Sequence, residues 1–245
     1  MFSIFKPKKH LVDLIPDNHI DIHSHLLPGI DDGAATVEMS EKLFSEMKKI
    51  GFSDFICTPH IMTSIWDNTA ETVANAHKLL LASESVMQKD TKIRYAAEYM
   101  MDSSFSEKVK AKELMCLKDD YVLVEMSYTN PPIQLYDIIF EVQCAGYKPV
   151  LAHPERYNFF HKNFGAYEKL KNAGCLFQLN LLSTVGYYST SVADCADKLL
   201  KKGFIDFCSS DVHHLKHTES FYKKVIIKET DALKTAIENT NLFRE

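Results

Sequence analysis

Seven short apolar runs, separated by helix-like segments, recur along this chain of 245 residues. Each run has the length and the β-branched or aromatic content that buried strands favour. The runs lie at 19–24, 53–58, 92–98, 121–126, 148–153, 175–180 and 204–210. The segments 36–50, 69–88, 132–145 and 189–202 carry apolar side chains at helical spacing. Such an alternation predicts an α/β fold, with a parallel sheet covered by helices.

Side chains that bind metals stand at or just beyond the C-terminal end of nearly every predicted strand. They are His23, His25, His60, Glu98, Glu125, His153, Asp211 and His213, and Asp32 stands in the loop after the first strand. In a closed barrel these strand ends converge on one rim, where barrel enzymes place their active sites. An open sheet would spread them along a line. The sequence therefore predicts a (β/α) barrel of seven strands, with its active site at the C-terminal ends of the strands.

Two pairs of these residues are spaced for joint metal binding. His23 and His25 stand two residues apart, and so do Asp211 and His213. In an extended strand, residues i and i+2 point to the same face, so each pair can bind one ion. The two pairs lie near opposite ends of the chain, and only the fold can bring them together.

The nine candidate ligands exceed the roughly four to six that one ion needs, so they suit two or three ions. Five imidazoles, four carboxylates and no thiolate favour Mn, Fe or Zn over Ca or Mg. Multinuclear sites lower the pKa of a bound water and neutralise the charge that develops on a phosphoryl group. Each motif alone is weak evidence, because an isolated histidine at a strand end is more often a hydrogen-bonded structural residue. Their shared position at successive strand ends favours the metal site.

Composition narrows the remaining classes. The net charge of −5 disfavours a nucleic-acid partner. The six cysteines form no CxxC pair and mostly lie in apolar runs, which predicts buried, reduced thiols. No apolar stretch has the length of a transmembrane segment and no signal-peptide pattern follows the start, so we expect a cytoplasmic protein. We expect residues 1–18 to be an N-terminal extension and residues 19–245 to form a single domain.

Arg156 is a candidate for phosphate binding. It lies three residues after His153, just past a predicted strand end. A guanidinium can hold phosphate oxygens with two parallel hydrogen bonds, which a lysine ammonium cannot do. The plainer alternative is a surface ion pair with Glu155 or Glu168. Other catalytic schemes lack support, because no cysteine has an arginine six residues later and neither a GxSxG elbow nor a P-loop occurs.

Six motifs occur in order between residue 19 and about residue 215: DIHSHLLPGIDDGA, ICTPHIM, AAEYMMD, YVLVEMS, AHPERY and SSDVHH. In this set the sequence resembles the polymerase and histidinol phosphatase (PHP) superfamily. It resembles more closely the bacterial tyrosine-protein phosphatases of capsule and exopolysaccharide loci, of which the DDG and HPER elements are typical. The resemblance implies a distorted (β/α)7 barrel of the TIM-like kind, with two or three metal ions, often manganese.

The resemblance also implies a role for each ligand. One ion is held by His23, His25, Glu98 and Asp211, a second by Glu98, Glu125 and His153, and a third by Asp32, His60 and His213. Asp31 would support these ligands without binding metal, and Arg156 matches the arginine that binds the substrate phosphate. The implied substrate is a phosphotyrosine protein, in particular the tyrosine-rich tail of a bacterial kinase that regulates capsule assembly.

One departure affects substrate contacts. The family often carries another arginine a few residues after the DxH motif, whereas this chain reads DVHHLKHTES. Lys216 or His217 would take that place in substrate binding. Two alternatives stay open: a small-molecule phosphatase acting on histidinol phosphate, and a non-catalytic metal-binding PHP module. A nuclease is disfavoured by the acidic balance.

Overall fold

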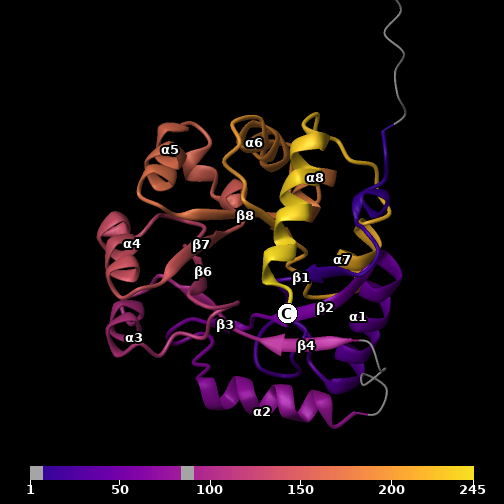
Figure 1. The fold of residues 1–245 in the computed structure, drawn as a ribbon, viewed down its shortest axis with the longest axis horizontal. Coiled ribbons are helices and arrows are strands. Elements are labelled where there is room, and N and C mark those ends of the chain that lie inside the picture. Colours follow the sequence, from indigo (N-terminus) through magenta and orange to yellow (C-terminus); the bar gives the residue numbers. More distant parts are fainter. Residues whose placement is uncertain (1–7, 84–90) are drawn as a thin grey trace, which may run out of the picture.

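The computed structural model describes residues 8–83 and 91–245. Its strands pair in parallel, in a three-stranded sheet of order β1-β2-β4 and a six-stranded sheet of order β3-β5-β6-β7-β8-β9. The strands are β1 (His19–Asp21), β2 (Phe52–Cys57), β3 (His60–Ile61), β4 (Lys92–Tyr95), β5 (Glu98–Met100), β6 (Tyr121–Glu125), β7 (Lys148–Ala152), β8 (Leu176–Asn180) and β9 (Phe207–Ser209). Figure 1 shows the strands toward the middle and the helices around the outside. The predicted parallel α/β arrangement is confirmed.

The two sheets are joined by the chain, but their hydrogen-bond ladders are interrupted. β2 leads into β3 and β4 leads into β5, and the Glu98 N–H donates to the Pro59 carbonyl across the break at 3.1 Å. Pro59 has no N–H to donate, which weakens the ladder at this point. At the other edge, the His25 N–H donates to the Val212 carbonyl at 2.9 Å. The run expected at 92–98 is therefore divided between β4 and β5, and the described residues show no closed barrel of seven unbroken strands.

The helices cover the strands from outside. They are α1 (Val37–Ile50), α2 (Ala70–Leu81), α3 (Phe105–Ala111), α4 (Leu135–Cys144), α5 (Gly165–Asn172), α6 (Thr190–Lys201), α7 (Leu215–Ser220) and α8 (Thr230–Asn239). Short 3₁₀ turns occur at Val12–Leu14, Pro154–Arg156, Asn158–Phe160, Leu181–Val185 and Thr240–Phe243. Within the described ranges, no helix is long and apolar enough to cross a membrane.

The four expected helices are confirmed as α1, α2, α4 and α6, although residues 84–88 of the expected 69–88 segment lie outside the described residues. The Thr36 side chain accepts a hydrogen bond from the Met39 N–H and caps α1, which ends at Gly51 with φ of +123°. Helices α3, α5, α7 and α8 were not expected. Three of these four have only 6 to 8 residues, too few for a clear helical period.

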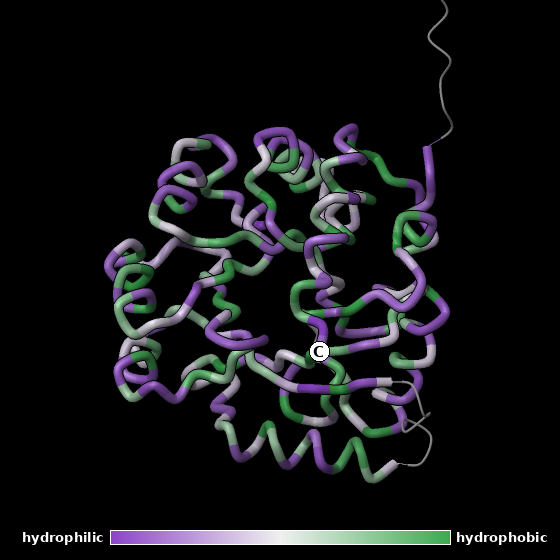
Figure 2. Tube along the Cα trace, viewed as in Figure 1, coloured by the Kyte–Doolittle hydropathy of each residue, from purple (hydrophilic) through white to green (hydrophobic). Residues whose placement is uncertain are grey.

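Apolar side chains are buried on both faces of the strands. In β6, Val122 and Val124 pack in the larger core, whereas Leu123 packs in a second cluster with Phe243 near the chain end. The alternation explains why this strand reads as a continuous apolar run. In Figure 2 the outer helices alternate hydrophobic and hydrophilic residues, as expected for helices with one face on the core. Four cysteines are buried and unpaired, as expected: Cys57, Cys175, Cys195 and Cys208.

The segment before β1 packs against the fold where it is described. Leu11 is completely buried, and its N–H donates to the Lys223 carbonyl at 3.0 Å. The Val12 N–H donates to the Phe221 carbonyl at 2.8 Å. The expected N-terminal extension thus contributes residues to the core, while residues 1–7 lie outside the described part.

His19 in β1 makes folding sensitive to acid. Its ring is buried beside Phe52, and neither ring nitrogen has a hydrogen-bond partner. Burial, with a smaller effect of Arg244, lowers its pKa from 6.5 to about 4. In the unfolded chain the His19 ring takes up a proton near pH 6.5, whereas in the folded chain it does so only near pH 4. The free energy of unfolding therefore falls as the pH drops from about 6.5 to about 4.

We expect His19→Leu to remove this acid sensitivity, which is worth on the order of 3 kcal/mol. Urea unfolding of both proteins at about pH 7 and about pH 4.5 measures the effect, because the other titrating groups contribute equally to both proteins. A variant that loses as much stability in acid as the wild type contradicts this account.

Candidate metal centre

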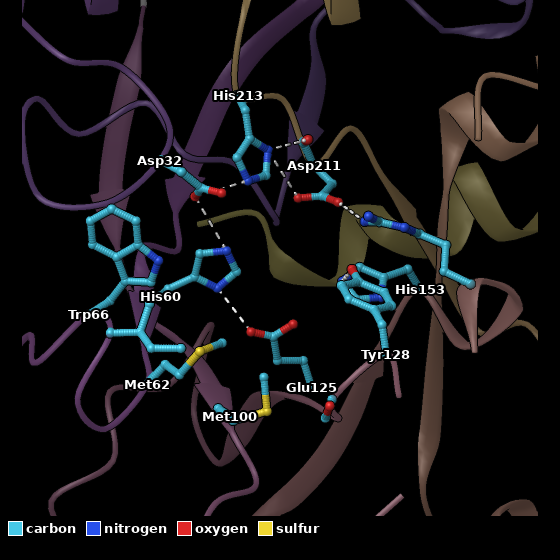
Figure 3. A pocket seen from close by; sticks show the side chains of 13 residues that line it. Asp32, His60, Met62, Trp66, Met100, Glu125, Tyr128, His153, Asp211 and His213 are labelled. Carbon is cyan, nitrogen blue, oxygen red and sulfur yellow. Dashed lines mark hydrogen bonds and ion pairs between the residues drawn. The ribbon is translucent and has the colours of Figure 1, made fainter. Parts of the chain in front are cut away.

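All nine predicted ligands meet at one end of the strands. Figure 3 shows those that line one cavity, namely Asp32, His60, Glu125, His153, Asp211 and His213. His23 and His25 follow β1, Asp32 lies in the next loop, His60 begins β3, Glu98 begins β5, Glu125 ends β6, His153 follows β7, and Asp211 and His213 follow β9. His23, His25 and Glu98 are completely buried. Residues far apart in the sequence thus form one cluster, as the strand-end pattern predicts.

The pleat of the strands and two unusual backbone conformations aim these side chains inward. Glu125 lies two residues after Leu123 and continues the same face of β6. His153 and Asp211 have φ angles of +36° and +52°. This left-handed region is uncommon outside glycine, although Asp and His enter it more readily than most residues. Backbone strain of this kind persists where the surroundings hold it, and it clusters at functional sites.

The Nε2 atoms of His23 and His25 face each other. Nδ1 of His23 lies 2.8 Å from Oε1 of Gln178, and Nδ1 of His25 lies 2.8 Å from Oδ2 of Asp31. Because both partners are acceptors, each Nδ1 carries a hydrogen, which leaves each Nε2 to take either a metal ion or a second proton. The two Nε2 atoms are 3.3 Å apart, and each is 3.3 Å from Oδ1 of Asp211. At these distances the three groups attract one another only with protons or a metal ion between them.

The shifted pKa values of the cluster also indicate that it binds positive charge. Burial lowers the pKa of His25, but Asp31, Asp211 and Glu98 outweigh it and raise that pKa well above the ordinary value. Burial also raises the pKa of Glu98, but the neighbouring histidines, with His23 first, hold it well below its usual range. The Glu98 carboxylate therefore stays ionised in a buried place, where it attracts protons or metal ions, whereas burial and the neighbouring Glu98 raise the pKa of Glu125 to about 7.

Glu98 lies at the centre of the cluster. Its Oε2 is 3.2 Å from Nε2 of His23 and 3.1 Å from Nδ1 of His60. Its Oε1 is 3.1 Å from Nε2 of His153. The two oxygens of one carboxylate thus face different histidines, which is the arrangement of a bridging ligand between two ions.

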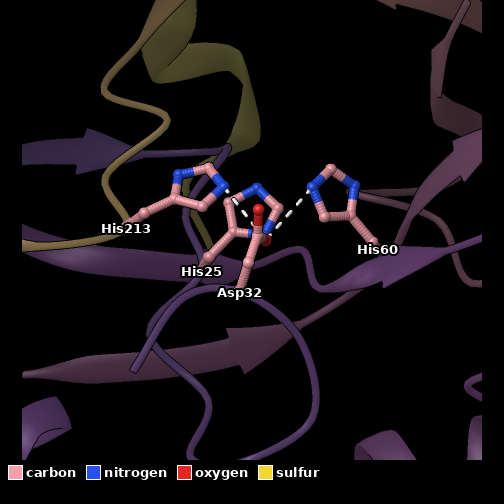
Figure 4. Close-up of side chains that lie close together, drawn as sticks. All are labelled: His25, Asp32, His60 and His213. Carbon is pink, nitrogen blue, oxygen red and sulfur yellow. Dashed lines mark ion pairs between the residues drawn. The ribbon is translucent and has the colours of Figure 1, made fainter. Parts of the chain in front are cut away.

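Four groups of side chains place their ligand atoms within 4.8 Å of one another. The groups are His25, Asp32, His60 and His213 (Figure 4); His23, Glu98 and His153; His23, His25 and Asp211; and His60, Glu98 and Glu125. They match the implied ligand sets in part, but His153 lies with His23 and Glu98, and Glu125 lies with His60. His60 Nδ1 lies 3.1 Å from Glu98 Oε2 and 2.9 Å from Glu125 Oε1, but these three buried atoms make no contact with hydrogen-bond geometry. The donor set and these atoms fit two or three metal ions.

Arg156 lines the same cavity, which has a volume of about 450 Å³. Its Nη1 lies 2.7 Å from Oδ2 of Asp211, so among the described residues its ion pair is with Asp211 rather than Glu155 or Glu168. The guanidinium carbon lies 4.1 Å from the ring centre of Tyr188 and 4.8 Å from that of Tyr128. The two rings hold the charge in place beside the metal cluster.

The structure does not bring Lys216 or His217 into the cavity, since neither is among its lining residues. His217 is buried, and its Nδ1 accepts a hydrogen bond from the His213 N–H at 3.1 Å. Its ring packs edge-on against Tyr187. His217 therefore supports the backbone of a candidate ligand, because its side chain points to the scaffold.

Several residues that support the ligands are not among those predicted from the sequence. Gln178 orients His23, and Asn180 donates to Oδ2 of Asp211 at 2.9 Å. Both stand at alternating positions at the end of the apolar run CLFQLN, a signal that they share the inward face of β8. Tyr128 and Tyr188 lie in loops and carry no such signal. Asp31, expected as a supporting residue, accepts hydrogen bonds from the N–H groups of Gly33 and His60 as well as contacting His25.

This chain is similar to known proteins. A family model described as "Capsular polysaccharide synthesis, CpsB/CapC" matches residues 19–229. Tyrosine-protein phosphatase YwqE of Bacillus subtilis is 26% identical over 92% of this chain and 94% of its own length. A chain from the crystal structures of YwqE from Bacillus subtilis and CpsB from Streptococcus pneumoniae, described as metal-dependent tyrosine phosphatases, matches with a TM-score of 0.71 and 26% identity, over 82% of this chain and 84% of that chain.

A histidinol phosphate phosphatase from Lactococcus lactis, solved with zinc, L-histidinol and phosphate, matches with a TM-score of 0.53. It covers 91% of this chain and 94% of that chain at 14% identity, which shows a shared fold alone. The family model, by contrast, spans most of the chain and all nine clustered residues. The chain therefore belongs to the CpsB/CapC family of capsular polysaccharide synthesis.

Proposed function

We propose that this protein is a metal-dependent tyrosine-protein phosphatase that hydrolyses phosphotyrosine in proteins. One observation carries the proposal: nine candidate metal ligands form one cluster, and six of them line a cavity together with an arginine, in a member of the CpsB/CapC family. The relatives YwqE and CpsB are described as tyrosine phosphatases. A phosphate that enters the cavity meets positive charge from both the metal site and Arg156.

The metal ligands in this proposal are His23, His25, Asp32, His60, Glu98, Glu125, His153, Asp211 and His213. We propose two or three manganese ions, and the mixed imidazole and carboxylate set also suits Fe or Zn. Bound metals supply Lewis acidity and an activated water for phosphoryl transfer. Gln178 and Asp31 keep the Nε2 lone pairs of His23 and His25 directed at the site.

Arg156 binds and orients the phosphate in this proposal. A guanidinium has five N–H donors, so its bond to Asp211 leaves donors for two phosphate oxygens. Tyr128 and Tyr188 limit the positions that the guanidinium can take. The tyrosyl leaving group has a pKa of about 10, so it departs with less help from an acid than an alkyl alcohol needs.

The proposal also includes the barrel, the domain bounds, the location in the cell and the substrate that the sequence predicts. We propose a distorted barrel of seven strands. Five of them are β1, β6, β7, β8 and β9, and the other two are formed by β2 together with β3 and by β4 together with β5. Residues 19–245 would form its single domain, and the protein would work in the cytoplasm. The physiological substrate would be the tyrosine-rich tail of a kinase that regulates capsule assembly.

A comparison of substrates tests the proposed function. With manganese added, we expect turnover of a phosphotyrosyl peptide and little turnover of histidinol phosphate, and we expect EDTA to abolish activity that manganese then restores. Hydrolysis of histidinol phosphate alone would assign the protein to small-molecule phosphatases. A metal-loaded protein that leaves even p-nitrophenyl phosphate intact would instead be a non-catalytic binding module.

A further inference from the structure

One side of the cavity above the metal cluster is apolar. Met62, Ile65 and Trp66 line it there, and Figure 3 shows Met62 and Trp66 across the cavity from Tyr128. Ile65 is 64% exposed, so its side chain is accessible to a molecule that enters the cavity. The cavity thus has a charged floor and an apolar wall.

A tight turn holds this wall in place. Met62 and Trp66 exchange two backbone hydrogen bonds of 3.0 and 2.8 Å, which close the turn. The Thr63 N–H donates to Oδ2 of Asp102 at 2.9 Å, and the Ser64 N–H donates to Oδ1 of Asp67 at 2.7 Å. Because the turn is anchored at both its base and its tip, the wall is in place before a ligand arrives.

We propose that this wall, with Trp66 and Ile65 at its centre, binds the aromatic ring of phosphotyrosine and selects it over phosphoserine. The inference rests on the proposed function and names the residues that determine its substrate class. With the phosphate on Arg156 and the metal cluster, a tyrosyl ring extends out of the cavity between the wall and Tyr128. Its faces and edges are then covered by apolar and aromatic surface, which favours binding.

A phosphoseryl side chain has no aromatic ring to pack against this wall. Its phosphate is one methylene away from the backbone, so the peptide itself would have to enter the cavity to place the phosphate on the floor. The apolar wall would then face polar backbone, and buried amide groups would lose hydrogen bonds to water. Selection therefore arises from the shape and polarity of the upper cavity, whereas the floor treats both phosphates alike.

Trp66 is the single tryptophan of the chain, so its fluorescence reports on the wall directly. We expect a peptide with phosphonomethyl-phenylalanine, which cannot be hydrolysed, to change the emission of the manganese-loaded protein. Inorganic phosphate, which reaches the floor alone, should change it far less. Equal changes with both probes would overturn the proposal.

Kinetics of two variants provide the second test. We expect Trp66→Ala to raise KM for a phosphotyrosyl peptide about tenfold, and Ile65→Ala about threefold, with kcat altered by less than about threefold. Turnover of a phosphoseryl peptide of the same sequence should not fall in either variant, so the preference for phosphotyrosine over phosphoserine should narrow. Phe140→Ala is the matched control, because this side chain is 67% exposed on α4 and does not line the cavity.

The outcomes separate this inference from the proposed function. A wild-type protein inactive on the phosphotyrosyl peptide would overturn the function itself. An active wild type whose Trp66→Ala and Ile65→Ala variants match Phe140→Ala would overturn only the role of the wall. Ile65 is exposed, so Ile65→Ala decides the question if Trp66→Ala fails to fold.

Discussion

Replacing Glu98 by Gln should nearly abolish phosphatase activity and deplete the protein of metal. Glu98 faces His23 and His60 with one oxygen and His153 with the other, so one substitution affects two of the four ligand groups most directly. Gln keeps the shape but removes the negative charge that attracts cations into this buried place. Losing several kcal/mol of transition-state stabilisation lowers kcat/KM by on the order of a thousandfold.

Elemental analysis beside a phosphopeptide assay measures both effects on the same sample. Glu107→Gln is the control, since it makes the same chemical change at an exposed position on α3. We expect the control variant to bind as much metal as the wild type and to hydrolyse the phosphopeptide at the same rate. Normal metal content and turnover in Glu98→Gln would contradict the bridging role of this carboxylate.

The convergence of the nine candidate ligands could be predicted because it depends on two simple geometric facts. Side chains two residues apart share a strand face, as in His23 and His25, and parallel strands present their C-terminal ends on one side. Neither fact depends on the details of packing. The pattern therefore survives even where β4 and β5 divide a run that was expected as one strand.

The grouping of ligands could not be predicted in the same way. Which histidine lies nearest to Glu98 depends on the left-handed backbone at His153 and Asp211, and sequence spacing carries no information on these angles. Supporting residues in loops, such as Tyr188, could not be predicted because loop positions have no strand or helix period that indicates their direction. The expected substrate contact at His217 instead became a support for His213, because α7 turns that ring toward Tyr187.

Replacing Arg156 by Ala should cut activity strongly while leaving the metals bound. The side chain contributes no metal ligand, and Asp211 keeps its hydrogen bond from Asn180 when the guanidinium is removed. Loss of a charged, aligned donor for phosphate typically costs about a hundredfold to a thousandfold in rate. Arg156→Lys should recover only part of this loss, because an ammonium cannot form two parallel hydrogen bonds with phosphate.

Two measurements separate this effect from damage to the metal site. Metal content should equal that of the wild type, and inhibition by inorganic phosphate should weaken in parallel with the loss of kcat/KM. Lys162→Ala, which removes an exposed cation six residues further along the chain, should change neither quantity. If Arg156→Ala loses its metals together with its activity, the guanidinium acts by holding Asp211 in the metal site rather than by binding the substrate.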